Sequence, residues 1–179
     1  MEESNDNVQY PAAELLAQHT YEDYKNNLDS YNRIYDKVNV ALAFCGVILL
    51  VLIEHVDFSL LRKALKATTF WTGFSMLFTF ALSAISVGMI VYATIMLIRL
   101  MESKEVLVFN SIEFRNEHRY KFTPDQAALA LILAYTNCIF DLQKKIKEKQ
   151  TKFDSVIILM AGSVLLYVLA VIWEKGLVI

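Results

Sequence analysis

The sequence predicts an all-α integral membrane protein with three transmembrane helices, long cytoplasmic helical extensions and an oligomeric assembly. Of the 179 residues, 56% are hydrophobic and the mean hydropathy is +0.39, which is more apolar than an ordinary soluble domain. The apolar residues gather in three blocks, at residues 38–53, 70–98 and 155–173. Because about 20 apolar residues cross the roughly 30 Å hydrocarbon core of a bilayer, each block is predicted to form one span.

The three spans divide the chain into four parts. Residues 1–37 are expected to form a cytoplasmic N-terminal helix. Residues 38–98 hold the first two spans, joined by an amphipathic linker at residues 54–69 that is typical of an interfacial helix. Residues 99–154 are expected to form a cytoplasmic loop and helix, and residues 155–179 the third span with a short outer tail.

The distribution of basic residues predicts the orientation of the spans. An N-terminus inside the cell places 13 Lys and Arg residues inside and four outside, as the positive-inside rule requires. Eight acidic residues between Met1 and Asp36, without an apolar core segment, argue against a secretory signal peptide. The C-terminus is therefore expected outside.

The N-terminal helix carries a stripe of apolar and tyrosine residues at heptad spacing. The stripe consists of Ala17, Tyr21, Tyr24, Leu28, Tyr31, Tyr35 and Val38, and it continues through Leu42, Cys45, Leu49 and Leu52. One helix from about Pro11 to His55 is predicted, with the stripe as a contact surface. Packing against a second helix of the same chain and packing between protomers both remain open.

A second long helix is predicted to begin at Thr123-Pro124-Asp125-Gln126, which has the pattern of a capping box. Residues 127–142 would form a helix that is apolar on nearly every face. A buried cytoplasmic helix is the preferred interpretation of this segment, over a fourth span. No breaker precedes the third span, so one helix of about 50 residues is predicted. The lysines at 144, 145, 147, 149 and 152 are assigned to topology and anionic lipid at the inner membrane face.

Residues 106–120 lack helical periodicity and are expected to form a small hairpin or an irregular loop. This segment holds Arg115-Asn116-Glu117-His118-Arg119, which resembles the arginine and histidine motif of HEPN ribonucleases. The resemblance makes Arg115 and His118 the candidate catalytic residues. Two residues separate them, fewer than in those motifs, so a solvated loop or a partner contact is the preferred interpretation.

The second span has one face with hydroxyl side chains and an opposite face with small residues. Hydroxyl side chains recur at steps of three and four, and they therefore share one face of the helix: Thr72, Ser75, Thr79, Ser83 and Ser86. Ala84 and Gly88 lie on the opposite face in a close-packing pattern. The hydroxyls are expected either to bond within the chain or to line a polar pathway formed by several copies.

Motifs for catalysis and metal binding are otherwise missing from the sequence. It contains no Gly-rich phosphate loop, nucleophile elbow or zinc-protease motif. Cys45 and Cys138 have no metal-ligand spacing and are interpreted as packing residues. We therefore expect no enzyme activity, no cofactor and no metal.

The N-terminal helix ends in Tyr-Asn-Arg-Ile-Tyr-Asp-Lys-Val at residues 31–38 and passes directly into the first span. This arrangement, with a long second span and a helix that leads into the last one, resembles the small membrane effectors of bacterial antiphage systems. Asp36-Lys37-Val38 approximates the Asp-Lys-Ala approach to the first span in Pycsar transmembrane effectors. The membrane accessory proteins of type VI-B CRISPR systems are a second resemblance, in which a degenerate HEPN site would match Arg115 and His118.

The resemblance implies a bacterial inner-membrane protein that oligomerises and disrupts or depolarises the membrane when infection is sensed. The expected function is thus an oligomeric effector that forms a pore or perturbs membrane integrity. The expected partners are the lipid bilayer, further copies of the chain, and a cytoplasmic protein or nucleotide signal, without direct nucleic-acid binding. The alternatives are a membrane scaffold or sensor that docks a cytoplasmic protein, and a membrane-tethered nuclease.

Overall fold

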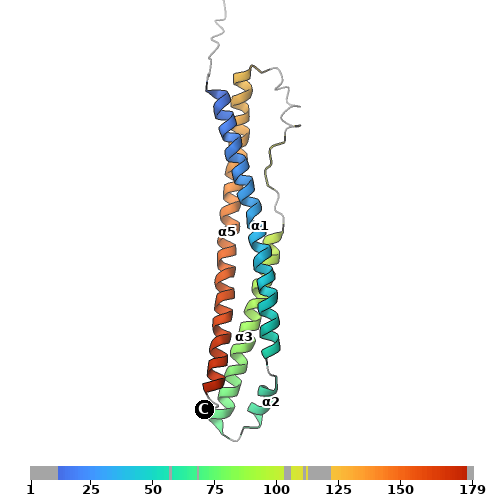
Figure 1. Ribbon diagram of the computed structural model, residues 1–179, viewed down its shortest axis with the longest axis vertical. Helices are drawn as coiled ribbons and strands as arrows, with labels where there is room; N and C mark the ends of the chain where they lie inside the picture. The colour runs from blue at the N-terminus through green and yellow to red at the C-terminus, as the bar shows by residue number, and fades with distance from the viewer. Residues whose placement is uncertain are drawn as a thin grey trace, which may run out of the picture. The chain divides into compact units, whose positions relative to one another are not determined.

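The computed structural model describes residues 12–56, 58–67, 69–102, 106–110, 112 and 122–176. Four helices are formed by these residues: α1 (Ala13–His55), α2 (Ser59–Leu65), α3 (Phe70–Met101) and α5 (Pro124–Gly176), as Figure 1 shows. No strand occurs within the described ranges, which confirms the all-α prediction. Three of the helices, α1, α3 and α5, are long and apolar enough to cross a membrane.

Helix α5 begins at the predicted capping box. The Thr123 backbone N–H donates to Gln126 Oε1 at 3.2 Å, and the Gln126 backbone N–H donates to Thr123 Oγ1 at 3.4 Å. These reciprocal bonds satisfy two N–H groups that the first turn of a helix leaves without a partner. From there α5 continues for 53 residues, which confirms that the second long helix and the third apolar block form one element.

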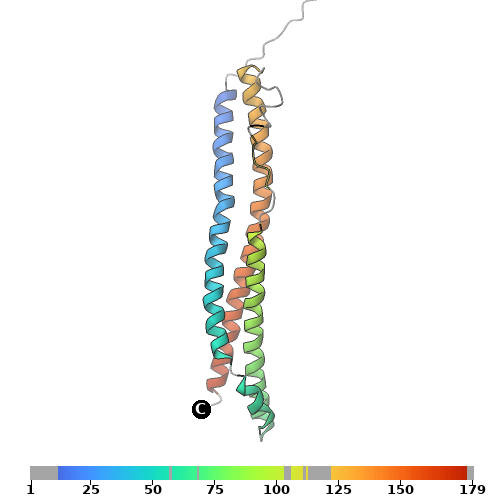
Figure 2. The ribbon, with the colours of Figure 1, turned by 90° about the vertical axis from the view of Figure 1, so that its right-hand side faces the viewer.

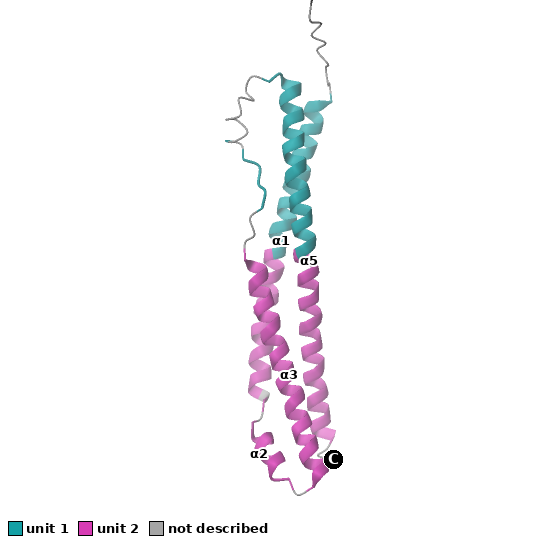
Figure 3. Cartoon of the chain, turned by 180° about the vertical axis from the view of Figure 1, so that it is seen from behind, with its two compact units in different colours: residues 1–34, 104–148 teal, residues 35–103, 149–179 magenta. Residues whose placement is uncertain are grey.

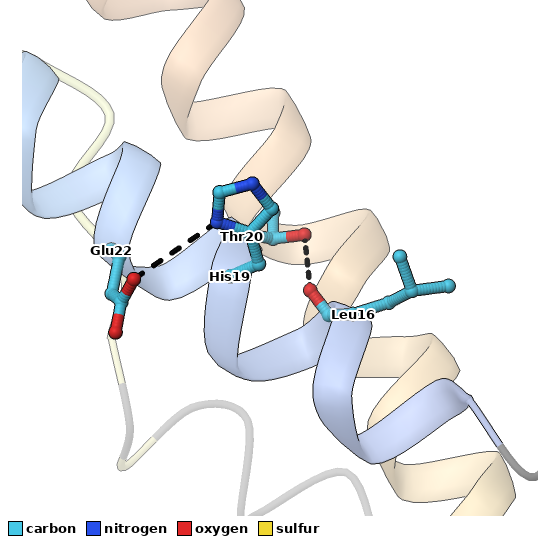
Figure 4. Close-up of polar contacts among 4 residues, drawn as sticks. All are labelled: Leu16, His19, Thr20 and Glu22. Atoms are coloured by element: carbon cyan, nitrogen blue, oxygen red, sulfur yellow. Dashed lines mark hydrogen bonds and ion pairs between the residues drawn. The ribbon is translucent and has the colours of Figure 1, made fainter.

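Helix α1 runs for 43 residues and confirms the single helix expected to end at His55. Pro11 lies outside the described residues. Polar side chains in the first turns of α1 bond locally, as Figure 4 shows for Thr20 Oγ1, which donates to the Leu16 carbonyl at 2.7 Å. His19 Nδ1 lies 4.0 Å from Glu22 Oε2, and an exposed pair of this kind contributes little to stability.

The two connections between the long helices differ in character. The amphipathic linker contains the short helix α2, which packs against α3. Residues 106–110, which follow α3, have neither helix nor strand, so the described part of this connection is an irregular loop rather than a hairpin. Residues 113–121 lie outside the described part of the chain.

The chain divides into two compact units, coloured separately in Figure 3. Unit 1 comprises Met1–Ile34 and Lys104–Glu148, and unit 2 comprises Tyr35–Ser103 and Lys149–Ile179. Unit 1 therefore contains the first half of α1 and the first half of α5. Unit 2 contains α2, α3 and the second halves of α1 and α5. The second half of α1, α3 and the second half of α5 correspond to the three apolar blocks.

Within unit 2, α3 runs antiparallel to both α1 and α5 (Figures 1 and 2). Three polar contacts fix the register of α3 against α5. Trp173 Nε1 donates to Ser75 Oγ at 2.8 Å, and Lys149 Nζ donates to the Leu100 carbonyl at 3.1 Å.

The contact between these two lies midway along the helix pair. Ser86 Oγ donates to the Ser163 carbonyl at 2.8 Å, and Ser163 Oγ donates to the Ser86 carbonyl at 2.9 Å. The small side chains at this level let the two backbones approach closely. A Cβ at Gly162 would lie only 3.3 Å from Met89 Cε, which shows how little space remains beside Ser163.

The outward faces of unit 2 are apolar. On α1, Val40, Phe44 and Val47 are all well over half exposed, and they recur at steps of four and three. Similar side chains cover α3 and α5, including Ile85, Ile98, Ile158 and Leu165. A soluble monomer rarely exposes so continuous an apolar surface, so these faces suit contact with lipid or with further helices.

The paired serines provide a test of the register. In purified protein in detergent, we expect Ser86→Ala and Ser163→Ala each to lower the free energy of unfolding by about 0.6 kcal/mol, and at most about 1.7 kcal/mol, the range for interhelical hydrogen bonds. The double variant should lose less than the sum, because the two hydroxyl oxygens also lie 3.1 Å apart and the effects of residues in direct contact are coupled. Unfolding by SDS titration measures these values.

Ser155→Ala is the matched control, because Ser155 is exposed and its hydroxyl donates to Thr151 in its own helix. It should leave stability nearly unchanged. Strictly additive losses for Ser86 and Ser163 would contradict the paired contact.

Candidate functional site

The hydroxyl face predicted for the second span lies in the interior of unit 2. Four of its members are buried, and we call them the hydroxyl row: Ser75, Thr79, Ser83 and Ser86. The fifth, Thr72, is exposed and donates to the Thr69 carbonyl at 2.8 Å. The row faces α5, since Ser75 and Ser86 bond to Trp173 and Ser163.

The members of the hydroxyl row satisfy their hydrogen bonds in different ways. Thr79 Oγ1 donates to the Ser75 carbonyl at 3.1 Å, one turn back on its own helix. Ser86 instead bonds across to α5 through both its hydroxyl and its carbonyl. The row thus combines contacts within α3 and between helices, the two arrangements expected for hydroxyls that bond within the chain.

Ala84 and Gly88 lie on the face of α3 that the other helices of the chain leave exposed. A Cβ placed on Gly88 would have no atom within 4 Å. Gly46 on α1 is open in the same way. The small-residue pattern predicted for close packing is therefore accessible to another helix.

A buried lysine joins the three long helices of unit 2. Lys149 on α5 is only 5% exposed. Its Nζ donates to Tyr35 Oη on α1 at 2.7 Å and to the Leu100 carbonyl on α3 at 3.1 Å, and it lies 4.1 Å from the centre of the Tyr35 ring. We call these three residues the Lys149 cluster.

The physical chemistry of the Lys149 cluster explains why a charge is tolerated there. Leu100 is one residue from the end of α3, where the carbonyls carry the negative end of the helix dipole. The Tyr35 ring adds a cation–π contact. An ammonium group with three donors can use all of these at once. Neighbouring Lys144, Lys147 and Lys152 are exposed, so Lys149 differs from the rest of its tract.

In unit 1, the tyrosine stripe of α1 packs against α5. Tyr135 lies 5.4 Å from Tyr24 and 5.5 Å from Tyr21, measured between ring centroids, and Phe109 lies 4.6 Å from Tyr135. Tyr24 Oη also accepts a hydrogen bond from the Phe109 backbone N–H at 3.3 Å. This aromatic cluster shows the stripe in contact with a helix of its own chain. Tyr135 is partly desolvated there, which raises the pKa of its hydroxyl.

The remaining stripe residues follow the same face. Tyr31 is buried and Leu28 is half-buried. Tyr35, the last stripe tyrosine, belongs to unit 2, where it forms the Lys149 cluster.

The irregular loop after α3 is held to α5 in unit 1 by Asp141. Its Oδ2 accepts from the Leu107 backbone N–H at 2.9 Å and lies 3.0 Å from Lys145 Nζ. The backbone hydrogen bond, followed by the lysine, lowers the pKa of the Asp141 carboxyl below its usual value. The carboxylate thus fixes Leu107 beside the aromatic cluster.

Other candidate residues are not brought into a site. Arg115 and His118 lie outside the described residues. Within the described ranges, no group of His, Cys, Asp and Glu is arranged to hold a metal ion. Cys45 and Cys138 are both buried free thiols in their respective units.

The sequence analysis did not predict several of the residues that form these contacts. Nothing in the sequence distinguishes Ser163, Trp173 and Tyr135, because each is one of many similar residues in an apolar helix. Lys149 was assigned only to the basic tract. Its position four residues after Lys145 gave no sign that it faces inward.

A double-mutant cycle tests the Lys149 cluster. Tyr35→Phe removes the hydroxyl and keeps the ring, so we expect it to lower the free energy of unfolding by about 1.5–3 kcal/mol, the usual contribution of a hydrogen bond to a charged group. In a Lys149→Met background the same change should have little effect. SDS titration in detergent measures both.

Tyr92→Phe serves as the control, because Tyr92 is exposed on α3, and it should change stability little in either background. An equal loss for Tyr35→Phe with and without Lys149 would show that the hydroxyl does not act through the lysine.

Comparison with protein-family models, with curated proteins and with solved structures finds no match to the chain. The basis for its function is therefore the set of contacts within the two units: the hydroxyl row, the Lys149 cluster and the aromatic cluster.

Proposed function

We propose that this protein is an oligomeric membrane effector whose unit 2 spans a bacterial inner membrane and, on activation, perturbs membrane integrity. In this proposal unit 1 is cytoplasmic, the C-terminus is outside, and unit 1 receives the controlling signal. The observation that carries the proposal is the hydroxyl row. Four hydroxyl side chains on one face of an apolar helix give unit 2 a polar interior.

The hydroxyl row supports a pathway only if several copies assemble. In a single chain the Ser86 and Ser163 side chains occupy the interface between α3 and α5. Three helices whose facing side chains are in contact leave no continuous path between them. The exposed face with Ala84 and Gly88 suits close packing against another copy, which supports an assembly of several copies. Since the hydroxyl row lies on the opposite face of α3, against α5, the rows of these copies would surround a common axis once α5 has moved away from α3.

The Lys149 cluster supports control of unit 2 by a cytoplasmic signal. Tyr35 and Lys149 are the first residues of unit 2 on α1 and α5, and both helices begin in unit 1. A protein or nucleotide that rearranged these helices in unit 1 would act on the elements that carry the cluster. The cluster in turn holds the end of α3, which carries the hydroxyl row.

The resemblance to small antiphage effectors supports the same proposal from the sequence side. It rests on the approach to the first span at residues 31–38 and on the order of the long helices. In that setting the signal would report infection, and loss of membrane integrity would be the outcome.

Liposome leakage tests the proposal. The full chain, reconstituted into dye-filled liposomes, should release dye, and native mass spectrometry in detergent should show several copies in one complex. Thr79→Leu with Ser83→Leu should reduce release to the level of empty liposomes, because leucine replaces the hydroxyls with apolar volume. Release is followed by the fluorescence of the freed dye.

Ile85→Leu with Val91→Leu is the matched control, since both residues are exposed on α3 outside the hydroxyl row. This pair should leak as the parent does. A monodisperse monomer, or undiminished dye release by the variant with Thr79→Leu and Ser83→Leu, would overturn the proposal.

The scaffold alternative is favoured by one observation in unit 1. Leu129, Leu133 and Phe140 recur at steps of four and seven on α5, and Leu133 and Phe140 are 66% and 67% exposed. In water such a stripe suits the apolar face of a partner helix. A cytoplasmic protein docked there would make the chain a membrane scaffold or sensor.

Site-specific crosslinking separates the two functions. A photoreactive residue at Leu133 should capture one soluble protein in living cells, whereas the same residue at Leu165 in unit 2 should not. Leu129→Asp with Phe140→Asp should abolish the capture, because buried carboxylates without partners are costly. Crosslinks from position 133 that reach only other copies of the chain would contradict the scaffold.

A further inference from the structure

A small hollow in unit 2 lies where α2, the first turns of α3 and the last turn of α5 come together (Figure 1). Its volume is about 220 Å³, and its wall consists of Leu60, Lys63, Thr72, Ser75, Met76, Thr79 and Glu174. Lys63, Thr72 and Glu174 are exposed, so the hollow opens to the surface on their side. Ser75 and Thr79 are buried and therefore form its inner part.

The hollow reaches the first half of the hydroxyl row. Ser75 and Thr79 line it, whereas Ser83 and Ser86 do not. Thr72 and Thr79 are seven positions apart, which is about 10 Å along a helix at 1.5 Å per residue. The same distance separates Thr79 from Ser86, where α3 and α5 are in direct contact. The hollow therefore gives access to the start of the row and ends before this contact.

The inward face of α3 changes character after Ser86. Its next buried residues are Ile90, Ala93 and Leu97, and none of the three is exposed at all. We call them the apolar layer. They offer water no hydrogen bond, and closely packed apolar side chains of this kind keep it out. The inward face is thus polar at the end with the hollow and apolar towards the Lys149 cluster.

The wall of the hollow provides hydrogen-bond partners for water. Thr72 and Thr79 donate their hydrogens to the carbonyls of Thr69 and Ser75, so their oxygens remain acceptors. The Glu174 carboxylate is a further acceptor. A water molecule inside a protein needs about two to four polar partners. Acceptors on two helices supply them, although much of the wall is apolar.

Charged side chains indicate that the opening of the hollow lies in water. Lys63 on α2 and Glu174 on α5 both line it, and Lys175 follows directly on α5. Charged side chains are costly in the hydrocarbon core of a membrane and concentrate at its boundaries. In the proposed topology this end of unit 2 lies at the outer face, so water enters the hollow from outside the cell.

We propose that the hollow is a water-filled mouth, through which the outer side of the membrane reaches Ser75 and Thr79 while Ser86 stays dry. In the single chain the hydroxyl row is therefore open at its outer end and closed by the apolar layer. This inference deepens the proposed function, because it places the barrier on the cytoplasmic side, next to the Lys149 cluster. It rests on that function only for the orientation of unit 2.

Thiol accessibility tests the proposal in the full chain, reconstituted into phosphatidylcholine nanodiscs, where both membrane faces are open to the reagent. The buried native thiols are first replaced by Cys45→Ala and Cys138→Ala, and one cysteine is then introduced. A methanethiosulfonate with a quaternary ammonium group does not enter the hydrocarbon core, so it modifies only thiols in contact with water. The intact mass of the protein over time gives the rate.

Thr79→Cys should react at a rate close to that of Thr72→Cys, which lies at the opening. Ser86→Cys should react about a hundredfold more slowly, because only the thiolate reacts and a dry site disfavours the charged form. Phe78→Cys is the matched control, since Phe78 is the neighbouring residue on the apolar surface, and it should be as slow as Ser86→Cys. The proposal thus requires the buried position 79 to react faster than the exposed position 78.

A second pair of variants tests the route to Thr79. Leu60→Trp enlarges a side chain in the wall of the hollow, and it should reduce the rate for Thr79→Cys to that for Phe78→Cys. Leu61→Trp, at the next position of α2 and outside the wall, should leave the rate unchanged. Misfolding would expose the thiol and raise its rate, so a decrease cannot arise from it.

The orientation is tested separately in bacterial spheroplasts that express the chain. Reagent added outside should modify Lys175→Cys and spare Lys152→Cys, because these residues lie at opposite ends of the α5 segment in unit 2. The reverse pattern would place the mouth on the cytoplasmic side and would contradict the proposed topology.

Two results in nanodiscs would overturn the inference. Equally slow reaction of Thr79→Cys and Phe78→Cys would show that the hollow holds no water. Reaction of Ser86→Cys as fast as that of Thr79→Cys would show that the row is wet beyond the hollow. Neither result depends on assembly or on dye release, so this inference and the effector function can fail independently.

Discussion

The antiparallel contact of α3 with α5 is the constraint on which the rest of unit 2 depends. A hydrocarbon environment supplies no water, so every polar group inside it must find its partner in the protein. The hydroxyls of α3 meet this requirement at Ser86 through Ser163, and at Ser75 through Trp173. Leu100 lies 14 positions after Ser86 on α3, and its partner Lys149 lies 14 positions before Ser163, the partner of Ser86, on α5. Because the two spacings are equal in this antiparallel pair, both contacts belong to one register.

The shared register has a structural consequence for the motions that unit 2 can make. Sliding α5 along α3 by a heptad would place Val156 or Ala170 at the level of Ser86, and neither has a hydroxyl that could donate to the Ser86 carbonyl as Ser163 does. The hydroxyl of Ser163 would then have to bond elsewhere. Rotation or separation of the helices, in which new partners come from other copies or from water, is therefore more favourable than sliding.

The Lys149 cluster shows how a charge is accommodated at the edge of an apolar bundle. Taking an ammonium out of water is costly unless its donors are satisfied. The Tyr35 hydroxyl and the Leu100 carbonyl provide two acceptors on two helices. The compact ammonium on a flexible stem reaches both, whereas the planar guanidinium of arginine would need a wider site.

The parts of the fold that were predictable from the sequence are those set by neighbours in the chain. The capping box at Thr123 and Gln126 joins residues three apart, and the common face of the hydroxyl row follows from the period of a helix. The partners of that row were not predictable, because Ser163 is 77 residues from Ser86. Lys149 and Lys147 look equivalent in sequence, and only the packing of α1 and α3 around α5 separates a buried lysine from an exposed one.

The order of synthesis gives the hydroxyl row a further significance. In the proposed topology α3 enters the membrane before Ser163 has been translated. During this interval the Ser86 hydroxyl is in an environment without water and cannot yet bond to Ser163. Thr79, which bonds back to the Ser75 carbonyl, shows how such a side chain can be satisfied by its own helix in the interval. When α5 is inserted, Ser86 of α3 bonds to Ser163 of α5. The bundle is therefore complete only after insertion of α5.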